Sequence, residues 1–100
     1  MPYRIDYSPD AERHLRDLTA RQQALVVDTV NEQLTHQPTV PTRNRKLMRD
    51  HPIAQWELRI GDLRVYYLIK EEPEPMVDVR AIGLKLPGNR LFIDRKEIHW

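Results

Sequence analysis

The sequence contains no cysteine, so it can form neither disulfide bonds nor thiolate metal sites. It also has no apolar run near the ~20 residues that a membrane-spanning helix needs, and its first residues lack the apolar segment of a secretory signal peptide. Neither sign of charge dominates, because 16 Lys and Arg face 15 Asp and Glu. We therefore expect one soluble, cytoplasmic domain spanning residues 1–100, in which a polyanion site must come from local clustering of basic residues.

The N-terminal third predicts a strand followed by two helices. Residues 3–7 alternate apolar and polar side chains, which is typical of a strand. Ser8 and Pro9 form a helix start, and Thr19 with Gln22 has the spacing of a capping box. The apolar positions expected to face the core are Ala11, Leu15 and Leu18 in the first helix and Ala24, Val27, Val30 and Leu34 in the second.

The rest of the chain predicts strands. Residues 38–55 carry three prolines and predict a loop, with one helical turn near residues 46–49. The expected strands span residues 56–60, 63–70 and about 76–84, followed by a short tail at 90–100. Strands grouped after helices favour an α+β domain with the order β-α-α-β-β-β. Its antiparallel sheet would carry the N-terminal αα-hairpin on one face and leave the other face partly open.

A Gly-Asp pair between the first two of these strands predicts a two-residue hairpin turn, which fixes the register. Arg59 then lies opposite Arg64 and Glu57 lies opposite Tyr66, on the face turned away from the core residue Trp56. Two directly opposed arginines repel each other, and a phosphate between them would replace that repulsion with bidentate contacts. Glu57 would either hold the arginines in place or act as a general base. The same pattern also fits an ordinary solvent-facing strand with surface ion pairs.

Basic residues are densest just before this hairpin. Arg43, Arg45, Lys46 and Arg49 form either a solvated loop or a phosphate-binding segment. The histidines show no metal-ligand spacing and are expected at the surface.

The ordered combination of these features resembles the RelE/ParE superfamily of bacterial type II toxins. The segments that carry the resemblance are RNRKL at 43–47, WELRI at 56–60, LRVYY at 63–67, AIGLK at 81–85 and NRLFI at 89–93. In this superfamily, RelE-like members cleave mRNA in the ribosomal A site through attack by the RNA 2′-hydroxyl. ParE-like members poison DNA gyrase instead.

The resemblance implies roles for individual residues. Arg64 matches the arginine that stabilises the phosphate, and Arg59 matches the second of two lysines on the preceding strand. Lys85 falls where another arginine is expected. Glu57 replaces the first lysine and becomes the candidate base. Phe92 lies near a tyrosine position; it can stack on a nucleobase but cannot donate a proton. Relatives of this fold sometimes place an acid or base histidine late in the chain, so the resemblance makes His99 a candidate for that role.

The resemblance implies a toxin that acts as a ribosome-dependent mRNA endonuclease. No metal or cofactor is expected, because the nucleophile belongs to the RNA. The expected partners are a cognate antitoxin, in a hetero-oligomeric complex, and mRNA. The residues expected to contact RNA are Arg43, Arg45, Lys46, Arg49, Tyr66, Arg90 and Phe92. The substitution Arg64→Ala is expected to abolish toxicity without unfolding the protein. A ParE-like gyrase inhibitor and a non-enzymatic interaction module of the same fold remain alternatives.

Overall fold

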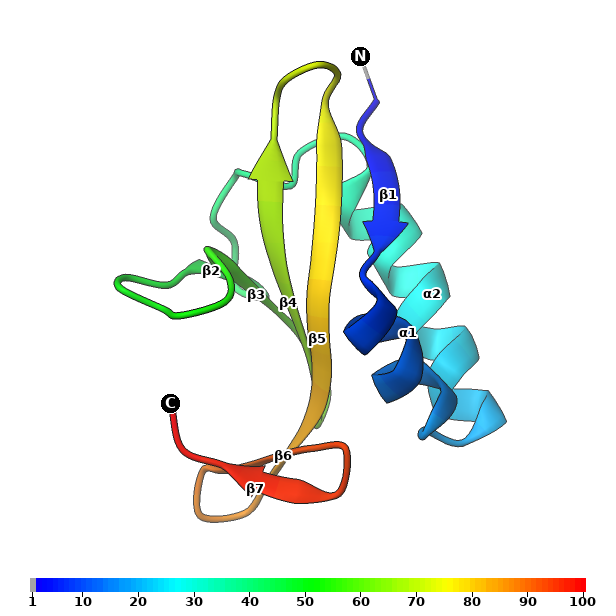
Figure 1. Cartoon of the computed structure of the whole chain (residues 1–100), viewed down its shortest axis with the longest axis vertical. Coiled ribbons are helices and arrows are strands. Elements are labelled where there is room, and N and C mark those ends of the chain that lie inside the picture. Colours follow the sequence, from blue (N-terminus) through cyan, green and yellow to red (C-terminus); the bar gives the residue numbers. More distant parts are fainter. Residues whose placement is uncertain (1) are drawn as a thin grey trace.

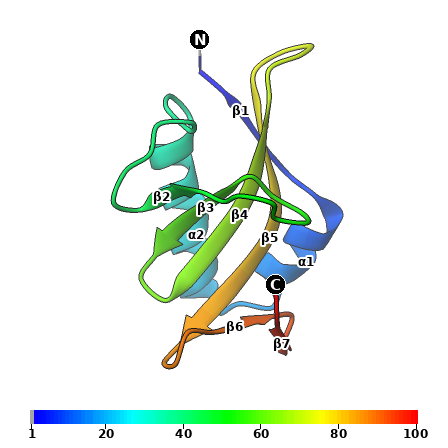
Figure 2. The ribbon, with the colours of Figure 1, turned by 90° about the vertical axis from the view of Figure 1, so that its left-hand side faces the viewer.

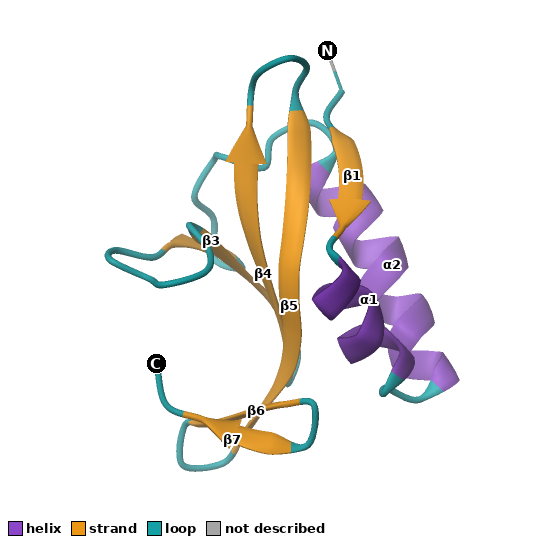
Figure 3. Cartoon of the chain, in the orientation of Figure 1, coloured by secondary structure: helices purple, strands orange, loops and turns teal. Residues whose placement is uncertain are grey.

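Two helices lie against one face of a seven-stranded sheet in the computed structural model, which describes residues 2–100 (Figures 1 and 3). The elements are β1 (Arg4–Tyr7), α1 (Pro9–Arg16), α2 (Ala20–Leu34), β2 (Arg45–Leu47), β3 (Trp56–Ile60), β4 (Leu63–Lys70), β5 (Met76–Leu86), β6 (Arg90–Ile93) and β7 (Lys96–Ile98). The sheet order is β2-β3-β4-β5-β6-β7, and β1 pairs with β5. All pairs are antiparallel except β1–β5, which is parallel. The α+β class and the helical layer are confirmed.

Both helices begin at the expected caps. The Ser8 Oγ accepts a hydrogen bond from the Ala11 N–H at 3.1 Å, and Thr19 with Gln22 forms the complete capping box. These contacts satisfy backbone donors that a helix N-terminus leaves free. The two helices run in opposite directions, as Figure 1 shows.

The apolar stripe of α2 differs from the prediction. The buried side chains are Val26, Val30 and Leu34, whereas Ala24 is exposed and Val27 is half-buried. The observed spacing of four residues and the predicted spacing of three are both compatible with one helix face. Two valines stand side by side in the sequence, so the pattern alone could not tell which one meets the sheet.

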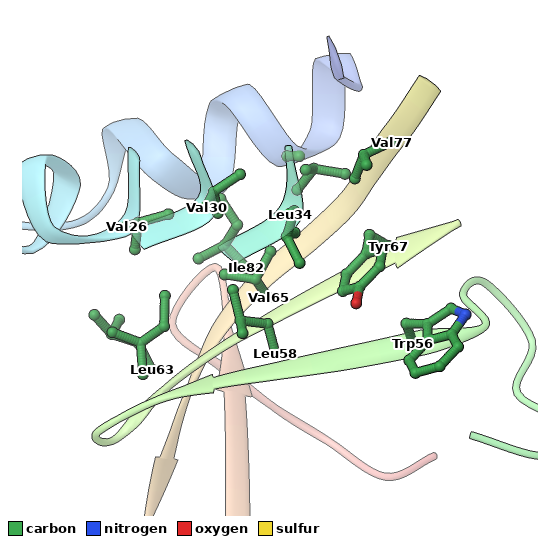
Figure 4. Close-up of a cluster of buried hydrophobic side chains, with 13 residues drawn as sticks. Val26, Val30, Leu34, Trp56, Leu58, Leu63, Val65, Tyr67, Val77 and Ile82 are labelled. Carbon is green, nitrogen blue, oxygen red and sulfur yellow. The ribbon is translucent and has the colours of Figure 1, made fainter. Parts of the chain in front are cut away.

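The main core fills the space between α2 and the strands (Figure 4). Val26 and Val30 of α2 lie over Leu58 and Val65 of the central hairpin, and all four are fully buried. The hairpin residues predicted for this face are all buried in this cluster: Trp56, Leu58, Ile60, Leu63, Val65 and Tyr67. Alternation along β3 and β4 therefore sorts the side chains as expected.

The hairpin register is confirmed at every position. Arg59 pairs with Arg64, and Glu57 pairs with Tyr66. Gly61 supplies the positive φ of +58° that the tight turn requires. Both arginines therefore lie on the face of the sheet opposite the helices.

Two expectations about local structure are wrong. The predicted helical turn at residues 46–49 is absent; residues 45–47 form the edge strand β2, which pairs with β3. The expected tail at 90–100 folds into the strands β6 and β7, joined by Asp94 and Arg95, which both have positive φ. Asp-Arg is not one of the usual sequence signals for such a turn, so the pattern did not reveal this hairpin.

The face opposite the helices is less open than expected. In Figures 1 and 2, the loop at residues 48–55 and the C-terminal strands both lie on this side of the sheet. They bury a second apolar cluster of Ala54, Tyr66, Ala81, Leu91 and Ile93, with Met48, Ile53 and Ile98 packed against it. The polar residues of the hairpin are thereby partly enclosed. No helix among residues 2–100 is long and apolar enough to span a membrane.

Candidate functional site

A row of directly opposed side chains crosses the sheet on the face away from the helices. Lys46 of β2 pairs with Glu57 of β3, which pairs with Tyr66 of β4. Ala81 of β5 completes the row. Strand pairing therefore places a cation, a carboxylate and a phenol side by side.

The three polar residues of this row line a pocket of about 350 Å³. The residues that the pocket adds to Lys46, Glu57 and Tyr66 are Met48, His51, Lys85, Asn89, Leu91, Ile98, His99 and Trp100. They come from the 48–55 loop, from β5 and from the C-terminal hairpin and its last residues. The loop and the C-terminal strands that cover this face of the sheet thus form the walls of the pocket. Apolar side chains from them line the pocket beside its polar groups.

The Tyr66 phenol is set up to donate a proton in a hydrogen bond. Its side chain is 2% exposed, while Glu57 opposite it is 8% exposed. Burial raises the pKa of Tyr66 well above its ordinary value, and the negative charge of Glu57 raises it further, while Arg64 acts in the opposite direction. The phenol therefore stays protonated at neutral pH and can serve the carboxylate or a ligand as a donor.

His51 has a fixed tautomer. Its Nδ1 accepts hydrogen bonds from the backbone N–H groups of Ile53 and Ala54, both at 3.3 Å. In the neutral ring the proton must then lie on Nε2. Nε2 is buried and has no hydrogen-bond partner within the described residues 2–100. The ring is parallel to that of Tyr66, with centroids 5.8 Å apart.

Two histidines are expected to make the free energy of unfolding depend on pH. Burial lowers the pKa of His51, against the opposing effect of Glu57, and burial followed by the charge of Arg13 lowers that of His14. Unfolded histidine titrates near pH 6.5, so below that pH the unfolded state binds more protons than the folded state. We expect the free energy of unfolding to fall as pH drops below about 6.5, measured by urea unfolding between pH 5.5 and 7.5.

The matched control for this decline is a histidine outside the pocket. The variant His51→Gln should show a shallower decline than the parent, whereas His36→Gln, at an exposed position, should keep it. A stability that is flat across this range would contradict the burial argument.

The fold and the sequence can be compared with those of known proteins. No protein-family model and no curated protein matches the chain. Among solved structures, it is similar to a chain of the crystal structure of the toxin-antitoxin complex RelBE2 from Mycobacterium tuberculosis. The sequence identity is 28% and the TM-score is 0.67, over 79% of this chain and 93% of that chain. The chain is a RelE-like protein.

In this RelE-like protein, four of the predicted site residues meet in the pocket. They are Glu57 and Lys85, predicted for catalysis, and Lys46 and Tyr66, predicted for RNA contact. Lys46 is exposed and Lys85 is half-buried, so both ammonium groups can meet an anion at the mouth of the pocket.

The arginine pair does not line the pocket. Arg59 is exposed, whereas Arg64 is 9% exposed and its guanidinium bends back to the hairpin turn. The Arg64 Nη1 donates to the Gly61 carbonyl at 2.7 Å and to the Leu63 carbonyl at 2.9 Å. The expectation that Arg64 is an exposed charge, removable without cost to folding, is therefore wrong. Carbonyls of its own hairpin, rather than a phosphate, offset the charge.

Arg45 is a structural residue, contrary to the expected RNA contact. It lies opposite Leu58 on the core face, is 7% exposed, and its Nη1 donates to the carbonyls of Gln33 and Gln37 at 2.6 and 2.7 Å. Its neighbours Arg43 and Arg49 are exposed but outside the pocket lining.

Phe92, which was predicted to stack on a nucleobase, lies outside the pocket that contains Tyr66. It alternates with Leu91 and Ile93, which point into the second apolar cluster. Phe92 instead lines a separate pocket of about 240 Å³ beside α1 and α2, so it cannot stack on a nucleobase held near Tyr66. Arg90 is exposed, bonds to Glu97 at 3.1 Å, and lies 5.2 Å from the Phe92 ring centre.

Among the polar and aromatic residues of the pocket, three were not predicted for the site, namely His51, Asn89 and Trp100, and His99 was named only as a candidate acid or base. Only the folding of the loop and the C-terminal hairpin over the sheet brings them together. The sequence offers one weak signal of this arrangement. A late turn at Gly88-Asn89 is followed by basic and aromatic residues in the last part of the chain. No group of metal-ligating side chains occurs within residues 2–100.

Proposed function

We propose that this RelE-like protein is the toxin of a type II toxin-antitoxin system and that it cleaves mRNA on the ribosome. The observation that carries the proposal is the position of the Glu57 carboxylate in a pocket between Lys46 and Tyr66, which Lys85 and His99 also line. A base, an acid and cations around one cavity are what transesterification of RNA needs. Its similarity to a chain of the RelBE2 complex supports the toxin assignment.

In the proposed reaction, Glu57 takes the proton from a ribose 2′-hydroxyl. The 2′-oxygen attacks the adjacent phosphorus, and the bond from phosphorus to the 5′-oxygen breaks. The leaving oxygen takes a proton from His99, the proposed acid, which leaves a 2′,3′-cyclic phosphate and a 5′-hydroxyl. Lys46 and Lys85 stabilise the charge that develops on the phosphate oxygens. The reaction also requires the attacking oxygen to be aligned with the bond that breaks. The ribosome would provide this alignment by orienting the RNA.

The proposed partners follow from this assignment. A cognate antitoxin would hold the toxin inactive in a hetero-oligomeric complex, and the similarity to a chain of a toxin-antitoxin complex supports this. Messenger RNA in the ribosomal A site would be the substrate, which places the proposed activity in the cytoplasm. The exposed Arg43 and Arg49 are suited to nonspecific contacts with RNA phosphates around the pocket.

A brief pulse of expression in bacteria tests this function. The 5′ ends of cellular mRNA are mapped, and DNA supercoiling is followed in the same cultures. We expect new 5′ ends at fixed codon positions within translated regions and unchanged supercoiling. Loss of supercoiling or double-strand breaks, with intact mRNA, would replace the proposal with a ParE-like action on gyrase. No effect on either would indicate a non-enzymatic module.

A further inference from the structure

The indole of Trp100 lies against the polar wall of the pocket. Its ring centre is 4.3 Å from that of His51 and 4.9 Å from that of Tyr66, and it is perpendicular to both rings at 87°. Trp100 itself is 48% exposed. It is therefore a large aromatic side chain that covers two pocket residues while half of its own surface faces solvent.

The nitrogen beneath this cover has an unused hydrogen bond. His51 Nε2 is inaccessible and has no partner among residues 2–100, although its tautomer makes it an N–H donor. Buried donors are nearly always paired, because an unpaired donor loses its hydrogen bond to water without replacement. An unpaired donor in the wall of a pocket suggests that a ligand supplies the acceptor.

The contacts that Trp100 makes with His51 and Tyr66 could be replaced by those of a bound ligand. Edge-to-face aromatic contacts are individually weak, and no hydrogen bond from the Trp100 side chain is present among residues 2–100. A nucleobase would offer the same aromatic contact, and its ring nitrogens or carbonyl oxygens would accept a hydrogen bond from His51 Nε2. A base therefore gains one interaction that the indole does not make.

We propose that Trp100 is a displaceable lid over a nucleobase subsite formed by His51 and Tyr66. This inference rests on the proposed RNA cleavage, since it assigns a place to the base next to the bond that Glu57 would act on. In the free protein the indole closes the subsite. On binding, the base takes its place and His51 acts as a positioning donor that holds the nucleotide beside Glu57.

The probe for this subsite is the trideoxynucleotide dApdApdA. It lacks the 2′-hydroxyl, so the proposed reaction cannot occur, and binding is measured apart from cleavage. The indole N–H signal of Trp100, assigned in an NMR spectrum with the variant Trp100→Phe, should move on titration. Trp100→Ala should tighten binding by about threefold to tenfold, because a competing aromatic contact is removed. His51→Ala should weaken binding by about twofold to tenfold, the range for one neutral hydrogen bond.

Matched controls are available for both variants. Leu25→Ala removes another apolar side chain that is 48% exposed, and His36→Ala removes an exposed histidine outside the pocket. Both should bind the probe as the parent does. Weaker binding by Trp100→Ala would show that Trp100 is a fixed stacking platform and would overturn the lid. An unmoved indole signal, or unchanged binding by His51→Ala, would also overturn it.

The two experiments distinguish a wrong assignment of the Trp100 lid from a wrong assignment of RNA cleavage. If the protein leaves mRNA intact in cells while the trideoxynucleotide moves the indole signal and the two variants behave as stated, cleavage is refuted and the subsite stands. If mRNA is cleaved at codon positions but Trp100→Ala binds the probe more weakly, the function stands and the lid is refuted.

Discussion

In the proposed reaction, the variant Glu57→Gln is expected to cleave ribosome-bound mRNA about 100-fold to 10,000-fold more slowly than the parent, the usual range for loss of a general base. The amide keeps the shape of the carboxylate and can still accept a hydrogen bond from Tyr66, but it cannot take a proton from the 2′-hydroxyl. The rate is measured by primer extension on stalled ribosomes under single-turnover conditions, so that product release does not limit it.

The control for this variant is Glu32→Gln on the exposed surface of α2. It makes the same chemical change outside the pocket and should cleave at the parental rate. Because Glu57 is nearly buried, urea unfolding of Glu57→Gln must accompany the assay. A folded Glu57→Gln protein that retains more than a tenth of the parental rate would remove Glu57 from the reaction.

The position of Glu57 shows how much of the site was predictable from the sequence. Its register opposite Tyr66 follows from a two-residue turn and from alternation, which are local rules. Its place beside Lys46 depends on β2, a three-residue edge strand in a proline-containing segment that looks like a loop. With β2 in place, alternation alone sends Lys46 to the pocket and Arg45 to the core. The error about Arg45 therefore follows from the missed strand.

The residues that form the walls of the pocket could not be predicted from the sequence, for a different reason. They depend on how the C-terminal hairpin lies over the sheet, which is a long-range contact. Gly83 permits it, because a Cβ there would come within 2.8 Å of both Ile93 Cγ1 and the Phe92 carbonyl oxygen. A glycine inside a strand signals a close approach of other backbone but not which segment approaches. His51 and Trp100 could not be assigned to the site without that knowledge.

The covering of the sheet by the C-terminal hairpin also gives Arg59 and Arg64 different exposure to solvent. Arg64 lies opposite Gly83 in the sheet, so it occupies the row over which the C-terminal hairpin passes. Arg59 is one strand further out and stays exposed. The two residues face each other in register, yet their burial gives them different roles. Arg64 holds the turn together, whereas Arg59 is free to meet an external anion.

We therefore expect Arg64→Ala to lower the free energy of unfolding by about 2 to 3 kcal/mol, since hydrogen bonds from charged groups contribute about 1.5 to 3 kcal/mol and the carbonyls of Gly61 and Leu63 would lose theirs. Arg59→Ala should change it by less than about 0.5 kcal/mol, as exposed substitutions usually do. Urea unfolding of both variants measures the difference at equal pH and ionic strength.

Toxicity of the two variants must then be compared at equal amounts of folded protein. If Arg64 acts only through the turn, Arg64→Ala regains most of its activity under stabilising conditions such as added sulfate or low temperature, because the pocket residues are intact. If Arg64→Ala is as stable as the parent and still inactive, its guanidinium must leave the turn to bind phosphate during the reaction. In that case the arginine predicted from the sequence would be a catalytic residue, and the hydrogen bonds to Gly61 and Leu63 would describe only the resting state.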